Sequence, residues 1–202
     1  MHTLEERPMS AINTSDATPV QSAGLGIADP GPLGLAAFAL TTFVLSFTNT
    51  GLFKAEPVVF GLALAYGGVA QVLAGMWEFK KGNTFGATAF TSYGAFWLSF
   101  WYLTGHTDLS GVANADDVAH GVGLFLLAWF IFTAYMFVAS LHTNPKLIAV
   151  FGLLTVTFAL LALADLTTTE GLTKAGGWFG VATALVAWFT SFSGVVASTR
   201  RQ

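Results

Sequence analysis

Long apolar stretches alternate with short polar connections along most of the chain. Six such stretches lie near residues 33–53, 57–79, 84–104, 118–141, 146–166 and 176–198. A helix needs roughly 20 apolar residues to cross the hydrocarbon core of a bilayer. The pattern therefore predicts an all-α membrane protein with six transmembrane helices.

The connections are short, as expected for a compact helical bundle. A Lys-Lys-Gly-Asn turn signal at 80–83 separates the second and third stretches, and Asn-Pro at 144–145 separates the fourth and fifth. Residues 1–28 are polar and lack the apolar core of a signal peptide. We expect a flexible tail over 1–28, a transmembrane domain over 29–199 and a short C-terminus over 200–202.

Composition narrows the class of protein further. The 202 residues include only 8 basic and 11 acidic side chains, or 9% charged, against about 25% in soluble domains. This composition excludes a soluble enzyme and a nucleic-acid-binding protein. The chain has no cysteine, so thiolate chemistry and cysteine-ligated metals are excluded as well.

Basic residues predict the orientation, because cytoplasmic loops are enriched in lysine and arginine. An even number of spans places both termini on one side, which we expect to be the cytoplasm. The basic residues then assigned to the cytoplasmic side are Arg7, Lys80, Lys81, Lys146, Arg200 and Arg201. Lys54 and Lys174 are assigned to the outer side.

Three segments begin alike, at 33–38, 85–90 and 151–156. Each has Leu or Phe before Gly, followed by small or apolar residues, and each lies in an odd-numbered helix. One interpretation is three two-helix units in parallel order, an arrangement that occurs in transporters. The alternative is that such pairs are simply frequent in membrane proteins.

Polar side chains follow single helix faces. In the third stretch, Thr84, Thr88, Thr91 and Ser92 fall at helical spacing, with Tyr93 beside them. They either line a polar path or bond within and between helices. The candidate substrate-binding residues over the whole chain are Thr41, Asn49, Gln71, Thr88, Thr91, Ser92 and Thr155.

The few ionisable residues near the spans are informative. Glu78 is either an interfacial carboxylate that snorkels and pairs with Lys80 or Lys81, which we favour, or part of a proton-linked gate. Asp165 is either solvated at the interface, which we favour, or a proton site, and both acids are candidates for proton coupling. The histidines lack metal-ligand spacing, so no metal site is expected. No catalytic motif is present, so neither enzyme activity nor a cofactor is expected.

Two motifs resemble those of a known family. The segment 29–35 reads Asp-Pro-Gly-Pro-Leu-Gly-Leu and resembles the signature Asn-Pro-x-Pro-Leu-Gly-Leu. The run Glu-Phe-Lys-Lys-Gly-Asn-Thr-Phe-Gly at 78–86 continues into Thr-Ala-Phe-Thr-Ser-Tyr-Gly at 88–94. Both resemble the acetate uptake transporter family, of the succinate–acetate permease type. The signature residues are Asp29, Pro30, Pro32, Leu33, Gly34 and Leu35.

This resemblance implies a function and a fold. It implies six helices arranged as three two-helix repeats, a fold similar to that of the acid-gated urea channels. It also implies a homohexamer that moves acetate and related short carboxylates such as succinate. It also implies a hydrophobic constriction made by Phe38, Tyr93 and Leu154. Asp29 departs from the family's asparagine. It either caps the first helix, which we favour, or repels an anion at the inner mouth.

Three functions stay open. The favoured one is transport of acetate and related carboxylates, with a proton or through an anion channel. A channel for a neutral solute such as urea or ammonia fits the same fold. A membrane regulatory or scaffold protein without transport would use the small-residue faces equally well.

Overall fold

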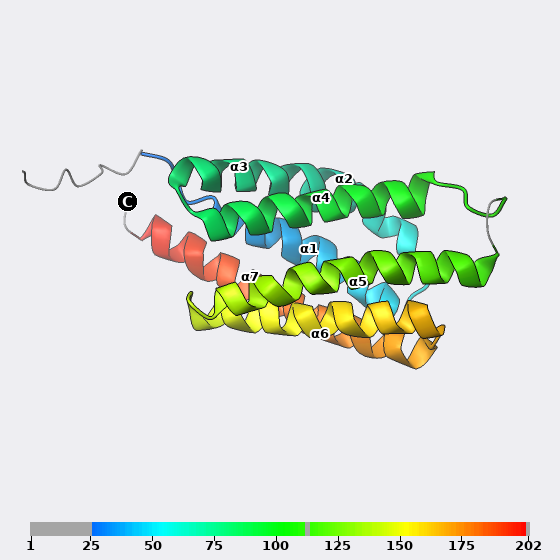
Figure 1. Ribbon diagram of the computed structural model, residues 1–202. Helices are drawn as coiled ribbons and strands as arrows, with labels where there is room; N and C mark the ends of the chain where they lie inside the picture. The colour runs from blue at the N-terminus through cyan, green and yellow to red at the C-terminus, as the bar shows by residue number, and fades with distance from the viewer. Residues whose placement is uncertain (1–25, 112–113, 201–202) are drawn as a thin grey trace, which may run out of the picture.

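The protein is described here by a computed structural model that covers residues 26–111 and 114–200. These residues form a bundle of long helices lying side by side, without a β-strand among them (Figure 1). The helices in chain order are α1 (Gly31–Asn49), α2 (Phe60–Leu64), α3 (Gln71–Lys81), α4 (Thr84–His106), α5 (Ala115–Ser140), α6 (Pro145–Thr167) and α7 (Glu170–Thr199). A 3₁₀ turn, η2 (Glu56–Val59), precedes α2, and η3 (Ala65–Ala70) joins α2 to α3.

Successive helices run up and down the bundle. Helices α1, α4 and α6 run in one direction, and α3, α5 and α7 return in the other (Figure 1). Both ends of the described chain, at residues 26 and 200, therefore lie at the same end of the bundle. We call this the terminal end and the opposite one the distal end.

Five segments are long and apolar enough to cross a membrane: α1, the continuous segment Glu56–Lys81, α5, α6 and α7. Helix α4 has 23 residues but is not among them. Its Thr, Ser, Tyr and Trp side chains lower its hydropathy, and Tyr93 and Trp97 are buried within the bundle. The prediction of six apolar spans is thus corrected to five apolar helices and one of mixed polarity.

Two predicted boundaries were wrong. The first helix ends at Asn49 rather than near 53, because the chain turns at Gly51, whose φ is +80°. The last helix begins at Glu170, six residues before the predicted start at 176, because the polar residues that precede the apolar stretch are helical as well. An ion pair of 2.9 Å between Lys174 and Glu170 stabilises that turn.

Asparagine side chains start three helices. Oδ1 of Asn83 accepts from the Gly86 N–H at 3.1 Å, and Asn114 and Asn144 cap α5 and α6 in the same way. Gly82 ends α3 in the left-handed conformation, with φ of +80°. The turn predicted at 80–83 is therefore confirmed: Gly82 ends α3, and the next residue, Asn83, caps α4.

Close helix contacts occur at glycines. A Cβ on Gly75 of α3 would meet Oγ1 of Thr91 and lie 2.7 Å from its backbone nitrogen. A Cβ on Gly177 of α7 would lie 2.5 Å from the Thr50 nitrogen, just after α1. Small residues allow helices in a membrane to approach this closely. Helices α3 and α4, and likewise α1 and α7, pack along these contacts.

The segment η3 is a π-helix, which the hydrophobic pattern did not predict. It contains Gly67, where a Cβ would lie 2.6 Å from Oγ1 of Thr41 on α1. It ends directly before Gln71, the first residue of α3. Short π-helical segments are frequent at functional sites.

Candidate functional site

Two cavities enter the bundle from opposite ends. The first, of about 470 Å³, is lined by Asp29, Lys81 and Asn144 at the terminal end. The second, of about 340 Å³, is lined by Asn49, Glu56 and Asp165 at the distal end. Phe38 and Leu154 line both cavities. These two side chains therefore lie where the cavities approach each other.

The three residues of the predicted constriction are brought together. Phe38, Tyr93 and Leu154 are each at most 5% exposed, and the rings of Phe38 and Tyr93 have centroids 5.8 Å apart. Tyr93 lines the first cavity. They come from α1, α4 and α6, the three helices that run in the same direction. Helix packing thus places three buried side chains of one apolar cluster next to the cavities.

The hydroxyl hydrogen of Tyr93 is engaged within the bundle. The hydroxyl donates to Oγ1 of Thr133 at 2.9 Å, and Thr133 donates to the Trp129 carbonyl at 2.7 Å. Thr133, on α5, is fully buried. Nothing in the sequence of α5 indicated this role, because a single threonine in an apolar helix usually bonds only to its own backbone.

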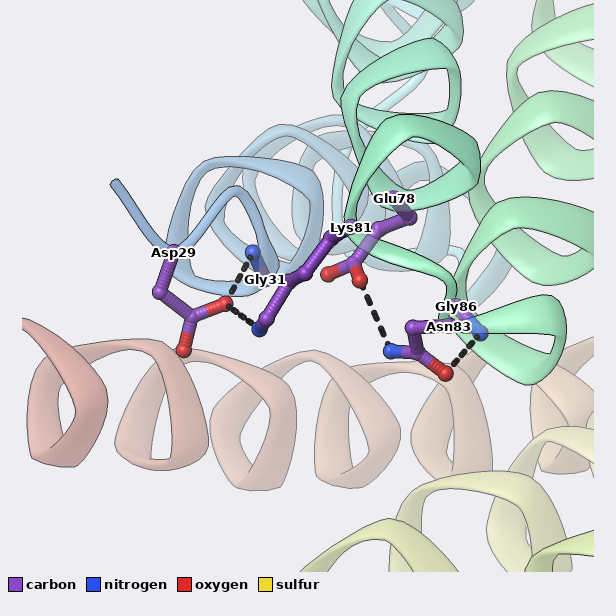
Figure 2. A network of polar contacts seen from close by, with 6 residues as sticks. All are labelled: Asp29, Gly31, Glu78, Lys81, Asn83 and Gly86. Atoms are coloured by element: carbon purple, nitrogen blue, oxygen red, sulfur yellow. Dashed lines mark hydrogen bonds and ion pairs between the residues drawn. The ribbon is translucent and has the colours of Figure 1, made fainter. Parts of the chain in front are cut away.

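A polar network lies at the terminal end of the first cavity (Figure 2). Nζ of Lys81 donates to Oδ1 of Asp29 at 2.8 Å, and the Gly31 N–H donates to the same oxygen at 3.1 Å. Partial burial raises the pKa of Asp29, but the bonds from Lys81 and Gly31 outweigh it and hold that pKa below its ordinary value. The N-cap position of α1 is Pro30, and Asp29, one residue earlier, accepts from the Gly31 N–H at the start of the helix and also pairs with Lys81.

Glu78 takes part in a separate contact. Its side chain is only 1% exposed, and its Oε2 accepts from Nδ2 of Asn83 at 2.7 Å (Figure 2). The favoured interpretation, a snorkelling carboxylate paired with a lysine, is wrong. Lys81 pairs with Asp29, and Asn83, whose orientation is fixed by its bond from the Gly86 N–H, faces Glu78 instead.

The signature residues hold the start of α1 in place. Pro30 precedes the helix and Pro32 lies in its first turn, while the hydroxyl of Ser191 on α7 donates to the Pro32 carbonyl at 2.6 Å. Gly34 faces the ring of Phe90, which would lie 2.7 Å from a Cβ there. Leu35 lines the first cavity, whereas Leu33 is 44% exposed.

Polar groups without partners lie deeper in both cavities. Gln71 lines the first cavity, is 1% exposed, and its Oε1 has no hydrogen-bond partner among the described residues. Thr42 and Trp97 line the second cavity, where Oγ1 of Thr42 and Nε1 of Trp97 likewise lack a partner in this part of the chain. Such buried groups are normally satisfied, so water or a solute is the expected partner. Of these three, the sequence indicated Gln71 as a site residue.

Of the remaining predicted site residues, some line a cavity and others do not. Asn49 and Asp165 line the second cavity, together with Glu56, which the sequence analysis did not select. The other predicted residues, Thr41, Thr88, Thr91, Ser92 and Thr155, line neither cavity. Thr41 and Thr155 donate to carbonyls one turn back in their own helices. On α4, Phe90 and Tyr93 line the first cavity and Thr104 lines the second, whereas the predicted Thr88, Thr91 and Ser92 lie outside both.

Comparison with known proteins identifies the family. The model of the GPR1/FUN34/yaaH family matches residues 11–201. This chain belongs to that family. The match includes all of the helices that line the two cavities.

Relatives within the GPR1/FUN34/yaaH family are close. Ammonia transport outward protein 2 of Saccharomyces cerevisiae is 42% identical over 175 residues, which cover 83% of this chain and 61% of the yeast protein. The succinate-acetate/proton symporter SatP of Escherichia coli K12 is 41% identical over 155 residues, covering 77% and 81%. The chain thus spans about three fifths of the length of the yeast relative.

A solved structure has the same fold. The bacterial acetate channel SatP superposes with a TM-score of 0.78 at 38% identity, over 86% of this chain and 94% of that one. The names of these GPR1/FUN34/yaaH family relatives describe transport rather than catalysis. The chain is therefore an all-helical protein with the fold of a membrane channel.

Proposed function

We propose that this chain moves acetate and related short carboxylates, such as succinate, across a membrane, and that it is not an enzyme. The observation that carries the proposal is that Phe38 and Leu154 line both cavities, with Tyr93 packed on Phe38. In this proposal these three side chains form one narrow apolar passage between the mouths of the two cavities. The names of the relatives, an acetate channel and a succinate-acetate/proton symporter, support the choice of solute.

The chemistry of the passage favours a neutral form of the solute. Phe38, Tyr93 and Leu154 offer an apolar surface that suits a methyl group, and the Tyr93 hydroxyl is occupied by Thr133. Removing water from a carboxylate without a compensating partner is costly. We therefore infer that the carboxylate crosses together with a proton, as the neutral acid or as a coupled pair.

Two carboxylates are placed to exchange that proton. Glu78 lines the first cavity and Asp165 lines the second, on opposite sides of the constriction. We propose both as proton-coupling residues. Gln71 in the first cavity and Asn49 in the second are the proposed substrate-binding residues, because their side chains offer amide donors.

The same passage favours a second candidate function, a channel for a neutral solute. The constriction carries no charge, and one relative is named for the outward transport of ammonia. Ammonia and urea are neutral and need no proton to cross an apolar barrier. A comparison of carboxylate and urea flux separates the two functions.

The deciding experiment measures labelled acetate uptake into proteoliposomes at neutral pH, with and without a proton gradient. Protein-free liposomes run alongside, because acetic acid crosses lipid unaided. Accumulation only with the gradient supports proton-coupled transport, and equilibration without accumulation supports a channel. Flux no faster than in empty liposomes overturns the carboxylate proposal and favours the neutral-solute or scaffold function.

We further propose that both termini face the cytoplasm, so that the first cavity opens inward. The exposed Lys80 at the terminal end and Asp108 near the distal end are suitable reporter positions. Because the chain has no cysteine, a single Lys80→Cys or Asp108→Cys substitution gives a unique label. A membrane-impermeant thiol reagent on intact cells should label the second variant and spare the first, and the reverse pattern would invert the orientation.

Finally, we propose a homohexamer of three-repeat protomers in the plasma membrane. In support, the repeat segments all lie near the starts of α1, α4 and α6, which run in parallel. Large exposed apolar side chains such as Phe189, Phe192 and Leu124 are available to contact lipid or neighbouring protomers. Native mass spectrometry of the detergent-solubilised protein tests the stoichiometry, and a monomer under mild conditions would contradict it.

A further inference from the structure

We propose that Asp29 is a tethered anion that occupies Lys81 at the mouth of the first cavity and thereby lowers the affinity of that mouth for a carboxylate solute. Asp29 would then set the affinity for the substrate, in addition to accepting the hydrogen bond from the Gly31 N–H. The inference rests on the proposed function, because it takes the solute to be a carboxylate.

The Asp29–Lys81 contact is the kind of contact that a solute carboxylate would make. A carboxylate oxygen accepts from the ammonium at 2.8 Å, and both side chains line the first cavity (Figure 2). The side chains are 50% and 40% exposed, so a dissolved anion can reach the lysine. The solute and Asp29 therefore compete for one cation.

Lys81 is the cation in this cavity that holds a carboxylate. The charged residues lining the cavity are Asp29, Glu78, Lys81 and Lys146, which sum to zero formal charge. Glu78 is engaged by Asn83, and Nζ of Lys146 lies 5.2 Å from the centre of the Phe189 ring. Removing the charge of Asp29 gives the mouth a net positive formal charge and leaves Lys81 without its hydrogen-bonded carboxylate, with Glu78 as the remaining acid of the cavity.

Asp29 is held in position by the backbone. The Gly31 N–H donates to the same Oδ1 that Lys81 contacts, and Pro30 restricts the chain between them. Asparagine is nearly isosteric and can keep the bond from Gly31 through its own Oδ1. The substitution Asp29→Asn therefore removes the competing charge and keeps the hydrogen bond from the Gly31 N–H.

The experiment measures KM and kcat for labelled acetate supplied from the terminal-end side, in vesicles of known protein orientation. Exposed ion pairs are weak, so Asp29→Asn should lower KM by about two- to fivefold and leave kcat unchanged. Lys81→Gln should raise KM, and in that background Asp29→Asn should have no further effect on KM. Added salt should narrow the difference between the wild type and Asp29→Asn.

A matched control removes the same charge elsewhere. Asp108 is an exposed acid near the distal end, and Asp108→Asn should leave KM at the wild-type value. A single cooperative melting transition for each detergent-solubilised variant shows that it is folded. An unchanged KM in folded Asp29→Asn, or an effect that persists with Lys81→Gln, would overturn the inference. Absence of acetate flux in the wild type would instead overturn the proposed function.

Discussion

The hydroxyl of Tyr93 donates a hydrogen bond of 2.9 Å to Oγ1 of Thr133, a residue 40 positions later in the chain. This bond joins α4 to α5 and orients the ring against Phe38 and Trp129, with centroid distances of 5.8 and 6.1 Å. Because the hydroxyl hydrogen is already donated, the proposed role of Tyr93 is that of an apolar wall of the passage.

Two substitutions of Tyr93 separate the ring from the hydroxyl. Tyr93→Phe loses one buried hydrogen bond, at about 0.5–1.5 kcal/mol, and should keep acetate flux and its preference over larger carboxylates. Tyr93→Ala removes a buried ring, at about 3–5 kcal/mol, and should admit butyrate or benzoate. The melting temperature of each variant measures its stability, and the ratio of butyrate to acetate flux measures its selectivity. A loss of selectivity in Tyr93→Phe would show that the hydroxyl contacts the solute.

Gly75 should not tolerate a side chain. In Gly75→Ala, the new Cβ meets Thr91, including its backbone nitrogen at 2.7 Å, so α3 and α4 must separate. We expect a cost of about 1–3 kcal/mol and a lower melting temperature. Gly61→Ala is the control, because no atom lies within 4 Å of a Cβ there and alanine favours the helix. Equal melting temperatures for the two variants would contradict the close contact.

Glu78→Gln tests proton coupling in the first cavity. Glutamine can still accept from Asn83, so the contact of 2.7 Å is retained while the ionisable group is lost. We expect gradient-driven acetate accumulation to fall to simple equilibration, with passive flux preserved. Asp108→Asn, which lies outside both cavities, should accumulate acetate normally. Normal accumulation in Glu78→Gln would exclude Glu78 as the proton carrier.

The ion pair between Asp29 and Lys81 predicts a pH dependence. Although partial burial raises the pKa of Asp29, the bonds from Lys81 and Gly31 hold it below its ordinary value of 3.8. The charged form therefore stabilises the fold above pH 3.8, and this contribution is lost as the pH falls through the lower, folded-state pKa. Because both groups are partly exposed, it amounts to less than about 1 kcal/mol.

Melting temperatures of the wild type and Asp29→Asn measure this effect. The difference between them should be constant from neutral pH to about pH 5 and should shrink as the pH falls below 3.8. In a Lys81→Gln background the difference should be smaller at every pH. A difference that grows on acidification would have the wrong sign for a carboxylate with a lowered pKa.

The sequence predicted the helices, the turn at 80–83 and the association of Phe38, Tyr93 and Leu154, the last of these through family resemblance. It did not predict which hydroxyls face a cavity. Thr91 fits a polar stripe by spacing, yet it packs on Gly75 and lies outside both cavities. Spacing shows which side chains share a helix face but not which neighbour that face meets.

The sequence by itself determined that this is a helical membrane protein, because helix length and low charge follow directly from the bilayer as solvent. It also predicted the turn at 80–83 and the break between helices at 144–145, because turn residues act locally. Only the tertiary structure decided that Asp29 pairs with Lys81, 52 residues away, that Asn83 contacts Glu78, and that Thr133 holds Tyr93. In a membrane, the pattern of apolar residues does not distinguish a helix face that contacts another helix from one that contacts an acyl chain. Which side chains meet is therefore determined by how the helices pack.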